Sequence, residues 1–248
     1  MALSVIRQAV RWTAGTVRAN SQDRNLNARR VAELIRLHKN GWQPLQEQDF
    51  KNQGSRYNVE PAALHAFSDI ESEGNGYTED GRLKILYEPH VVSRNTFHLY
   101  DFMEPQPVCG VVVSYPNWCK PGKLPPKCTK HPYNLSQEER WGLLAFAAEL
   151  DFEGALKGCS WGTFQILGEN WKALGYASVW HMVVSFYEEG EVAQLNSAIR
   201  FLDYKDVLDD MRRGEWDNVI AAWNGTGNVD VYLPKFLSRL RARRFIYR

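Results

Sequence analysis

The sequence has no stretch of about 20 apolar residues, so it offers no helix that could span a bilayer. It also has little net charge, +1 at neutral pH, and only four cysteines among 248 residues. A protein whose main partner is nucleic acid is expected to be basic, so this class is disfavoured. Hydrophobic residues make up 44% of the chain and charged residues 24%, which is typical of a folded globular protein with a large core.

The small net charge hides an uneven distribution along the chain. Residues 1–50 carry a formal charge of +4, residues 235–248 carry +6, and the remainder, 51–234, carries −9. The basic C-terminal segment is suited to contact an anionic surface. The alternative is that its arginines form the solvated face of a terminal helix whose apolar residues recur at helical spacing. Those apolar residues are Leu233, Phe236, Leu237 and Leu240.

The first 20 residues do not form a secretory signal, because arginines interrupt their apolar positions. Apolar residues at helical spacing predict a helix there, either packed on its own domain or in contact with a membrane or a delivery partner. A second helix is predicted over residues 28–38. We therefore expect a helical N-terminal segment of unknown role over 1–45 and one domain over 46–248.

Helical periodicity dominates the rest of the chain, and the fold class predicted from it is mainly α with a minor β element. Ser136 and Glu139 have the spacing of a capping box, which indicates a helix from there to about residue 150. The strand signal lies in 81–94, where a short strand or turn leads into a helix. The other predicted helices span 60–72, 169–174, 178–188, 189–203, 205–213, 215–223 and 230–246.

The four cysteines are Cys109, Cys119, Cys128 and Cys159. Three of them fall in an insertion, residues 104–134, in which nine residues are proline or glycine. Such a segment buries little surface and gains most from cross-links, so disulfide bonds among the four are expected, with the pairing left open. The Cys-x-x-His spacing of Cys128 and His131 offers a zinc site as a rival, but the remaining spacings match no common zinc motif. Free thiols are the third interpretation.

Glu71 is the first candidate for chemistry. It follows Leu64 by seven residues and Phe67 by four, so it shares the apolar face of the predicted helix 60–72. Burial and the negative end of the helix dipole both disfavour an ionised carboxylate, so both should raise its pKa. A carboxylic acid with a raised pKa can protonate a leaving oxygen. The alternative is a helix-end carboxylate that pairs with a nearby arginine.

Two glycine-containing segments, SWGTFQILG (160–168) and AWNGTGN (222–228), could complete such a site. Gln165 and Asn224 carry amides that can hydrogen-bond to a hydroxyl or acetamido group, and Trp161 could pack on the face of a sugar. The alternatives are core packing for the aromatic residues and a simple helix cap and turn for Asn224.

Four segments occur in an order that resembles the phage-type N-acetylmuramidases, a family with a lysozyme-like fold that includes phage endolysins. They are IESEGNGY (70–77), GRLKILYEPHVVSR (81–94), SWGTFQILGENWKALGY (160–176) and WNGTG (223–227). The order is also similar to that in goose-type lysozymes and soluble lytic transglycosylases. The resemblance covers about residues 45–245, and the insertion is an addition to the pattern.

The resemblance implies a peptidoglycan hydrolase that cleaves the β-1,4 bond between N-acetylmuramic acid and N-acetylglucosamine, with Glu71 as the general acid. Glu88, in LYEPH, matches a second acidic position and would line the cleft. Tyr87 beside it stands where phenylalanine is common, and it is a further candidate for substrate contact. Gln165 and Asn224 match positions that would contact the sugar.

Two alternatives remain at this stage. Attack by the muramic 6-hydroxyl would make the protein a lytic transglycosylase with 1,6-anhydro products, and an inactive site would leave a cell-wall-binding module. No cofactor, metal or nucleic-acid partner is expected.

The site of action is expected in the periplasm or cell wall of bacteria, reached through a holin, a virion or a secretion system. The protein would be an endolysin or an antibacterial effector, the latter with an immunity protein, and 235–248 could contact the anionic envelope.

Overall fold

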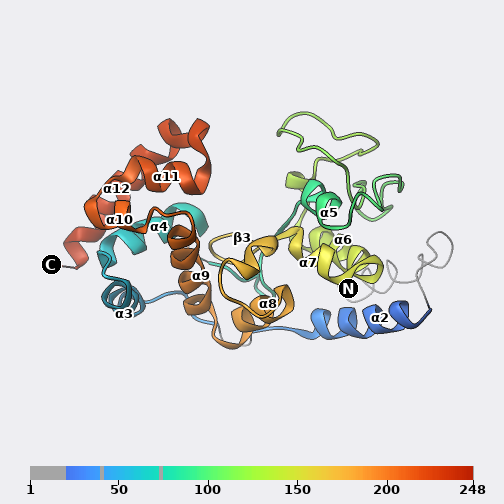
Figure 1. The fold of residues 1–248 in the computed structure, drawn as a ribbon, viewed down its shortest axis with the longest axis horizontal. Helices are drawn as coiled ribbons and strands as arrows, with labels where there is room; N and C mark the ends of the chain where they lie inside the picture. Colours follow the sequence, from blue (N-terminus) through green and yellow to red (C-terminus); the bar gives the residue numbers. More distant parts are fainter. Residues whose placement is uncertain (1–20, 40–41, 73–74, 248) are drawn as a thin grey trace.

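The computed structural model describes residues 21–39, 42–72 and 75–247, so the helix predicted over the first 20 residues lies outside the described part. Two groups of helices flank a small sheet (Figure 1). The first group consists of α3 (Glu47–Tyr57), α4 (Pro61–Ser72), α10 (Leu208–Arg213), α11 (Trp216–Asn224) and α12 (Val229–Ile246). We call it the C-terminal lobe.

The second group, the insertion lobe, carries residues 104–134 on its outer side (Figure 1). Its helices are α2 (Ser21–Arg36), α5 (Pro89–Asn95), the short 3-10 helix η1 (Pro132–Asn134), α6 (Gln137–Leu150) and α7 (Phe152–Lys157). The capping box at Ser136 and Glu139 is confirmed, with reciprocal side-chain to backbone hydrogen bonds at the start of α6. α2 packs on α6 through its buried residues Val31 and Leu34.

The sheet has three short antiparallel strands in the order β1 (Ile85–Tyr87), β2 (Cys159–Trp161) and β3 (Ile166–Leu167). Ile85 pairs with Trp161, and Ser160 pairs with Leu167. The 3-10 helix η2 (Gly168–Lys172), α8 (Val179–Glu188) and α9 (Glu191–Tyr204) follow the sheet. The mainly helical fold with a minor β element is therefore confirmed.

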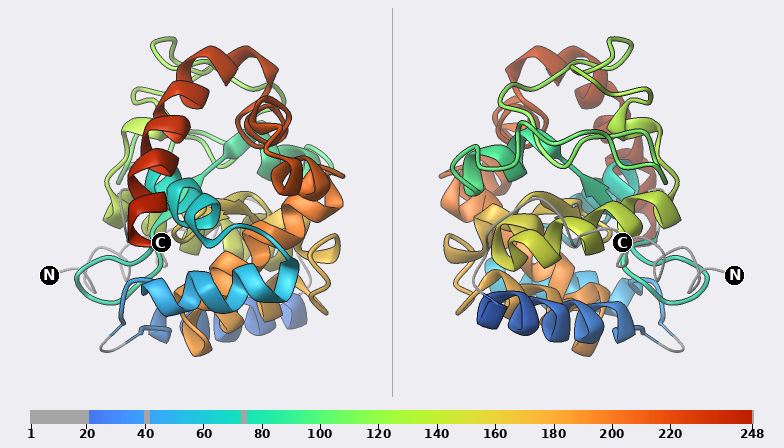
Figure 2. Two further views of the ribbon diagram at one scale, coloured as in Figure 1. Left: turned by 90° about the vertical axis from the view of Figure 1, so that its left-hand side faces the viewer. Right: turned by 90° about the vertical axis from the view of Figure 1, so that its right-hand side faces the viewer.

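Helix α4 is the element that places the candidate acid. Proline at its first position lacks the N–H that a helix start cannot satisfy, so it begins the helix at no hydrogen-bonding cost. Its inward face carries the buried residues Leu64 and Phe67. Helix α12 lies along α4, seen in Figure 2, with Phe236 and Leu240 buried. The apolar stripe predicted for the C-terminal helix is thus the packed face of α12.

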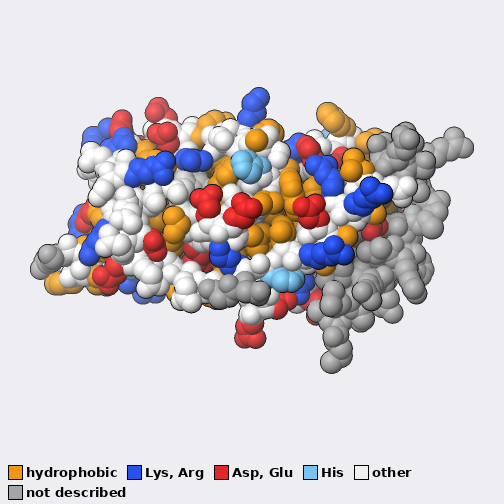
Figure 3. Space-filling view, turned by 90° about the horizontal axis from the view of Figure 1, so that it is seen from below, with side chains coloured by type: hydrophobic (Ala, Val, Ile, Leu, Met, Phe, Trp, Pro, Cys, Tyr) orange, Lys and Arg blue, Asp and Glu red, His pale blue; other side chains and the backbone are white. Residues whose placement is uncertain are grey.

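Ion pairs neutralise part of the basic C-terminal segment. Arg243 forms a bidentate pair with Asp69 of α4, with both N–O distances at 2.7 Å. Arg244 forms a similar pair with Glu60 just before α4. These arginines hold α12 to α4, which favours the interpretation of this segment as the outer side of a packed helix. In Figure 3, acidic, basic and apolar side chains are interspersed on the face seen from below.

The insertion holds its shape without disulfide bonds. The four cysteines are free thiols in the structure, which therefore contains none of the expected cross-links. Backbone and side-chain contacts replace them: buried Val111–Val113 join the core, and Tyr87 Oη donates to the Val113 carbonyl at 2.8 Å. Within the described residues, no cluster of histidine, cysteine and acidic side chains could hold a metal ion. Nor is any described helix long and apolar enough to cross a membrane.

Candidate active site

Glu71 lies in the last turn of α4, on the side facing α11. Asn224 Nδ2 donates to Glu71 Oε1 at 3.2 Å, and the indole of Trp223 is a second donor. Burial raises the pKa of Glu71, and the two hydrogen bonds, which favour the ionised form, lower it part of the way back. Among the described residues no arginine lies within ion-pair distance of Glu71. The predicted raised pKa therefore comes from burial.

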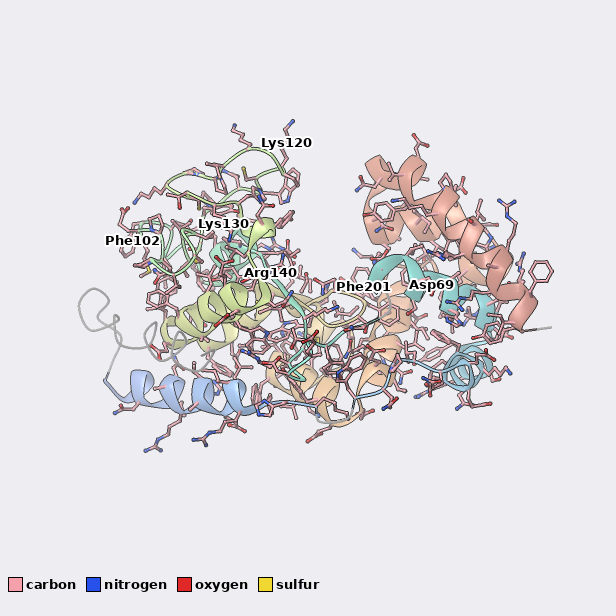
Figure 4. All side chains as sticks on the ribbon, turned by 180° about the vertical axis from the view of Figure 1, so that it is seen from behind. Asp69, Phe102, Lys120, Lys130, Arg140 and Phe201 are labelled. Carbon is pink, nitrogen blue, oxygen red and sulfur yellow. The ribbon has the colours of Figure 1, made fainter. Side chains whose placement is uncertain are left out.

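The end of α11 fixes both donors. The Trp223 ring meets Phe67 of α4 edge-on at 4.7 Å and Phe201 of α9 at 5.1 Å, so the indole is packed from two sides. Figure 4 shows Phe201 between the two lobes. Asn224 is the last residue of α11 and is followed by Gly225, whose φ of 83° ends the helix. Asn224 Oδ1 is buried and has no hydrogen-bond partner in the described chain, which leaves an acceptor free for a substrate.

Glu88 lies at the junction of β1 and α5, in the insertion lobe. Ser160 Oγ of β2 donates to Glu88 Oε1 at 2.8 Å, and His90 Nε2 lies 3.8 Å from Oε2. Burial raises the pKa of Glu88, the Ser160 hydrogen bond and the charge of Arg94 lower it, and the charge of Glu169 raises it. Burial and Arg94 lower the pKa of His90, so His90 is a neutral neighbour near pH 7.

The segment 160–168 forms β2, a tight turn and β3. Gly162 has a φ of 69°, and a side chain there would collide with Gln194 Oε1, so only glycine fits. Gln165 is half-buried with a φ of 47°, and its Nε2 donates to the Gly162 carbonyl at 2.8 Å. The structure therefore places Gln165 at the turn. Its amide nitrogen is engaged within the turn itself.

Trp161 and Tyr87 correct the sequence interpretation, because both are fully buried. Trp161 Nε1 donates to the Leu156 carbonyl at 3.1 Å, and its ring meets Trp141 edge-on. Tyr87 donates to the insertion through its hydroxyl. Both polar atoms are satisfied inside the protein, so neither side chain offers a surface to a sugar. Their role is to pack the sheet that carries Glu88 and Ser160.

Sequence reasoning missed a buried polar brace on α9. Glu191 is 4% exposed and accepts hydrogen bonds from Gly76 N at 2.7 Å, Thr163 Oγ1 at 2.8 Å and Leu45 N at 3.1 Å. Gln194 is fully buried and accepts from Thr163 N. The brace joins the chain just after Glu71 to the turn after β2. No local signal marks it, because a glutamate in the first turn of a helix is ordinarily a solvated charge.

The two carboxyl groups come from opposite lobes: Glu71 from the α4–α11 side and Glu88 from the β1–α5 side (Figure 1). Each is half-buried and has a pKa raised by that burial. A pair of such groups on two lobes is suited to acid–base work on a glycosidic bond.

Comparison with known proteins identifies the family and the fold. The sequence profile of the N-acetylmuramidase family matches residues 60–241, which include Glu71, Glu88 and Asn224. The crystal structure of the Burkholderia AP3 phage endolysin is similar in fold, with a TM-score of 0.66 and 23% identity over 99% of this chain and 95% of that chain. No curated protein matches the chain. The chain belongs to the N-acetylmuramidase family, glycoside hydrolases that act on peptidoglycan.

Proposed function

We propose that the protein hydrolyses the β-1,4 bond between N-acetylmuramic acid and N-acetylglucosamine in peptidoglycan, with Glu71 as the general acid. The observation that carries this proposal is the burial of Glu71 beside two neutral donors. Burial keeps its carboxyl protonated to higher pH, and it can then give its proton to the glycosidic oxygen as the C1–O bond breaks. The Asn224 and Trp223 hydrogen bonds then stabilise the carboxylate that remains.

Glu88 is proposed as the base that directs a water molecule to C1. Its raised pKa makes the ionised form a better proton acceptor than an ordinary glutamate. The Ser160 hydrogen bond holds one carboxylate oxygen, which leaves Oε2, on the His90 side, for the water. The proton lost by the water would pass to Glu88, while the departing sugar keeps the proton from Glu71.

The substrate contacts proposed for Asn224 and Gln165 follow from their positions. Asn224 Oδ1 is an unpartnered acceptor next to the proposed acid, so an acetamido N–H of the sugar is a suitable donor for it. Gln165 lies on the turn that Gly162 and the α9 brace hold in place. The protein is proposed to act where this polymer lies, in the bacterial cell wall.

Mass spectrometry of the soluble fragments released from purified sacculi tests this proposal. We expect reducing muropeptides that end in N-acetylmuramic acid, from the wild type and not from Glu71→Gln. Fragments lighter by one water would be 1,6-anhydro products. They would show that the protein is a lytic transglycosylase and not a hydrolase. Release of nothing by a wild type that still binds sacculi would leave a cell-wall-binding module.

A further inference from the structure

Trp118, in the insertion, is an aromatic side chain that is both exposed and fixed. It is 56% exposed, and its indole Nε1 donates to Tyr133 Oη at 3.1 Å. Tyr133 is itself held, since its backbone N–H donates to His131 Nδ1 at 3.2 Å and the two rings meet edge-on at 5.0 Å. An indole oriented through its own N–H presents a ring face at a low cost in conformational entropy.

The Trp118–Tyr133 pair is attached to the strand that ends at Glu88. η1, which contains Tyr133, packs on β1. Arg140 joins the two, donating to the Ile85 carbonyl at 2.9 Å and to the Tyr133 carbonyl at 3.0 Å. The charge of Glu88 also contributes, after burial, to the raised pKa of Tyr133, as expected for groups near one another. The exposed indole therefore belongs to the Glu88 side of the candidate active site.

Two unpaired lysines accompany the indole. Lys120 and Lys123 are exposed and make no ion pair within the described chain, whereas Lys127 and Lys130 pair with Glu104 and Glu139. A hydrogen bond of 3.0 Å from Cys119 Sγ to the Lys123 carbonyl closes the turn between the two lysines. Figure 4 shows Lys120 at the outer tip of the insertion, on its edge toward the C-terminal lobe. The unpaired positive charge thus lies two and five residues after Trp118 in the same loop.

We propose that Trp118, Lys120 and Lys123 form a subsite for an N-acetylhexosamine of the glycan strand beyond the two sugars that flank the cleaved bond. The indole face packs on the C–H face of the pyranose, and the lysines attract the carboxylates of the peptide stem that muramic acid carries. The inference rests on the proposed function, because it needs a glycan strand bound at Glu88. It gives the insertion a contact with anionic groups of the cell wall, which was one of the two interpretations of 235–248.

Binding measurements with a non-cleaving protein test the subsite. In a Glu71→Gln background, Trp118→Ala should weaken binding to long glycan strands about tenfold, the loss expected of an aromatic contact at the centre of a subsite. Trp118→Phe should retain most of the affinity. Binding of the isolated disaccharide should not change, since it fills only the sugars at the cleaved bond. Phe97→Ala is the matched control, because Phe97 is an 85% exposed aromatic residue of the same lobe in another loop.

The contribution of the two lysines is measured separately, by comparing binding to strands with and without peptide stems. Lys120→Gln with Lys123→Gln should weaken binding to strands with peptide stems, most strongly at low salt, and leave binding to strands stripped of stems by an amidase unchanged. Wild-type affinity for long strands in Trp118→Ala, or an equal loss in Phe97→Ala, would overturn the proposal. Thermal unfolding of each variant shows that it is folded. Fragment release by Glu71→Gln would refute the assignment of the acid, whereas a loss of affinity in Trp118→Ala without one in Phe97→Ala concerns the subsite alone.

Discussion

Glu71 and Glu88 have pKa values raised by the same cause, burial, but their surroundings differ in kind. Glu71 has neutral donors, the Asn224 amide and the Trp223 indole, at the end of α11. Glu88 has a hydroxyl donor, Ser160, and lies in the field of Arg94 and Glu169. These two form an ion pair that includes Arg94 Nε to Glu169 Oε2 at 2.9 Å. One carboxyl group has polar neighbours without charge, and the other has charged neighbours of both signs.

These surroundings suit the two groups to different steps of the reaction. At Glu71 burial outweighs the two hydrogen bonds from neutral donors, so the pKa is raised and the group can remain an acid until the substrate arrives. At Glu88 burial raises the pKa as well, but the Ser160 hydrogen bond and the charge of Arg94 both favour the ionised form, which can accept a proton from water. We therefore assign the acid to Glu71 and the base to Glu88.

The largest expected effect comes from removing each carboxylate in turn. Glu71→Gln and Glu88→Gln should each lower the rate of sacculus lysis by about 10²- to 10⁴-fold, the usual contribution of a general acid or a general base. Turbidity of a sacculus suspension measures both. Glu153→Gln, at an exposed position on α7, is the control and should match the wild type. A Glu71→Gln rate within a few-fold of the wild type would contradict the role of Glu71 as the acid.

The brace on α9 tests whether the two sides act as one site. Glu191→Ala leaves the buried donors of Gly76 and Thr163 without an acceptor, so we expect a loss of about 3 kcal/mol in the free energy of unfolding. The kcat for lysis should fall as well, because the chain after Glu71 loses its anchor. Chemical denaturation and kinetics at a temperature where the variant is folded separate the two effects. Normal kcat in the folded variant would make Glu191 purely structural.

The pH dependence of lysis should distinguish the roles of Glu71 and Glu88, with smaller changes in rate than the loss of either carboxylate. Activity should fall at high pH as Glu71 loses its proton and at low pH as Glu88 gains one. Asn224→Ala removes a hydrogen bond to ionised Glu71, so the pKa of Glu71 rises further. The fall in activity at high pH should then begin at a higher pH. Ser160→Ala removes the hydrogen bond that lowers the pKa of Glu88, so this pKa also rises. The fall in activity at low pH should then begin at a higher pH. If Asn224→Ala moved the low-pH side of the profile and Ser160→Ala the high-pH side, Glu88 would be the acid and Glu71 the base.

The smallest expected effect is that of Glu71 ionisation on the free energy of unfolding. The pKa of Glu71 is raised in the folded state, so the folded state binds its proton more tightly than the unfolded state. Ionisation of Glu71 therefore costs stability as pH rises above the unfolded value. Glu71→Gln should be more stable than the wild type at pH 8, with the difference vanishing at acidic pH, where Glu71 is protonated in both states. Thermal unfolding across pH measures this. A variant less stable than the wild type at pH 8 would contradict burial as the cause.

The sequence predicted the features that arise from local periodicity. Glu71 shares a face with Leu64 and Phe67, and α4 buries that face, so the spacing predicted the burial that raises the pKa of Glu71. The capping box at Ser136 could be recognised for the same reason. Asn224 was expected to contact substrate, and the structure adds that it holds the proposed acid.

The features that the sequence did not predict depend on distant contacts. β2 and β3 are three and two residues long, too short for alternation to be visible. α3 contains Gly54 and few apolar residues, and Val59 and Pro61 pack against that glycine. Burial of Tyr87 and Trp161 follows from the packing of the sheet, which no single segment encodes.

The ionisation of Glu71 itself is the most direct test of the assignment of the acid. The carboxyl carbons of protein labelled at glutamate can be followed by NMR across pH, with the Glu71→Gln spectrum identifying the Glu71 signal. The burial at the end of α4 predicts a titration midpoint clearly above that of ordinary glutamates, and a further rise in Asn224→Ala. A midpoint at or below the ordinary glutamate value would contradict the role of Glu71 as a buried general acid.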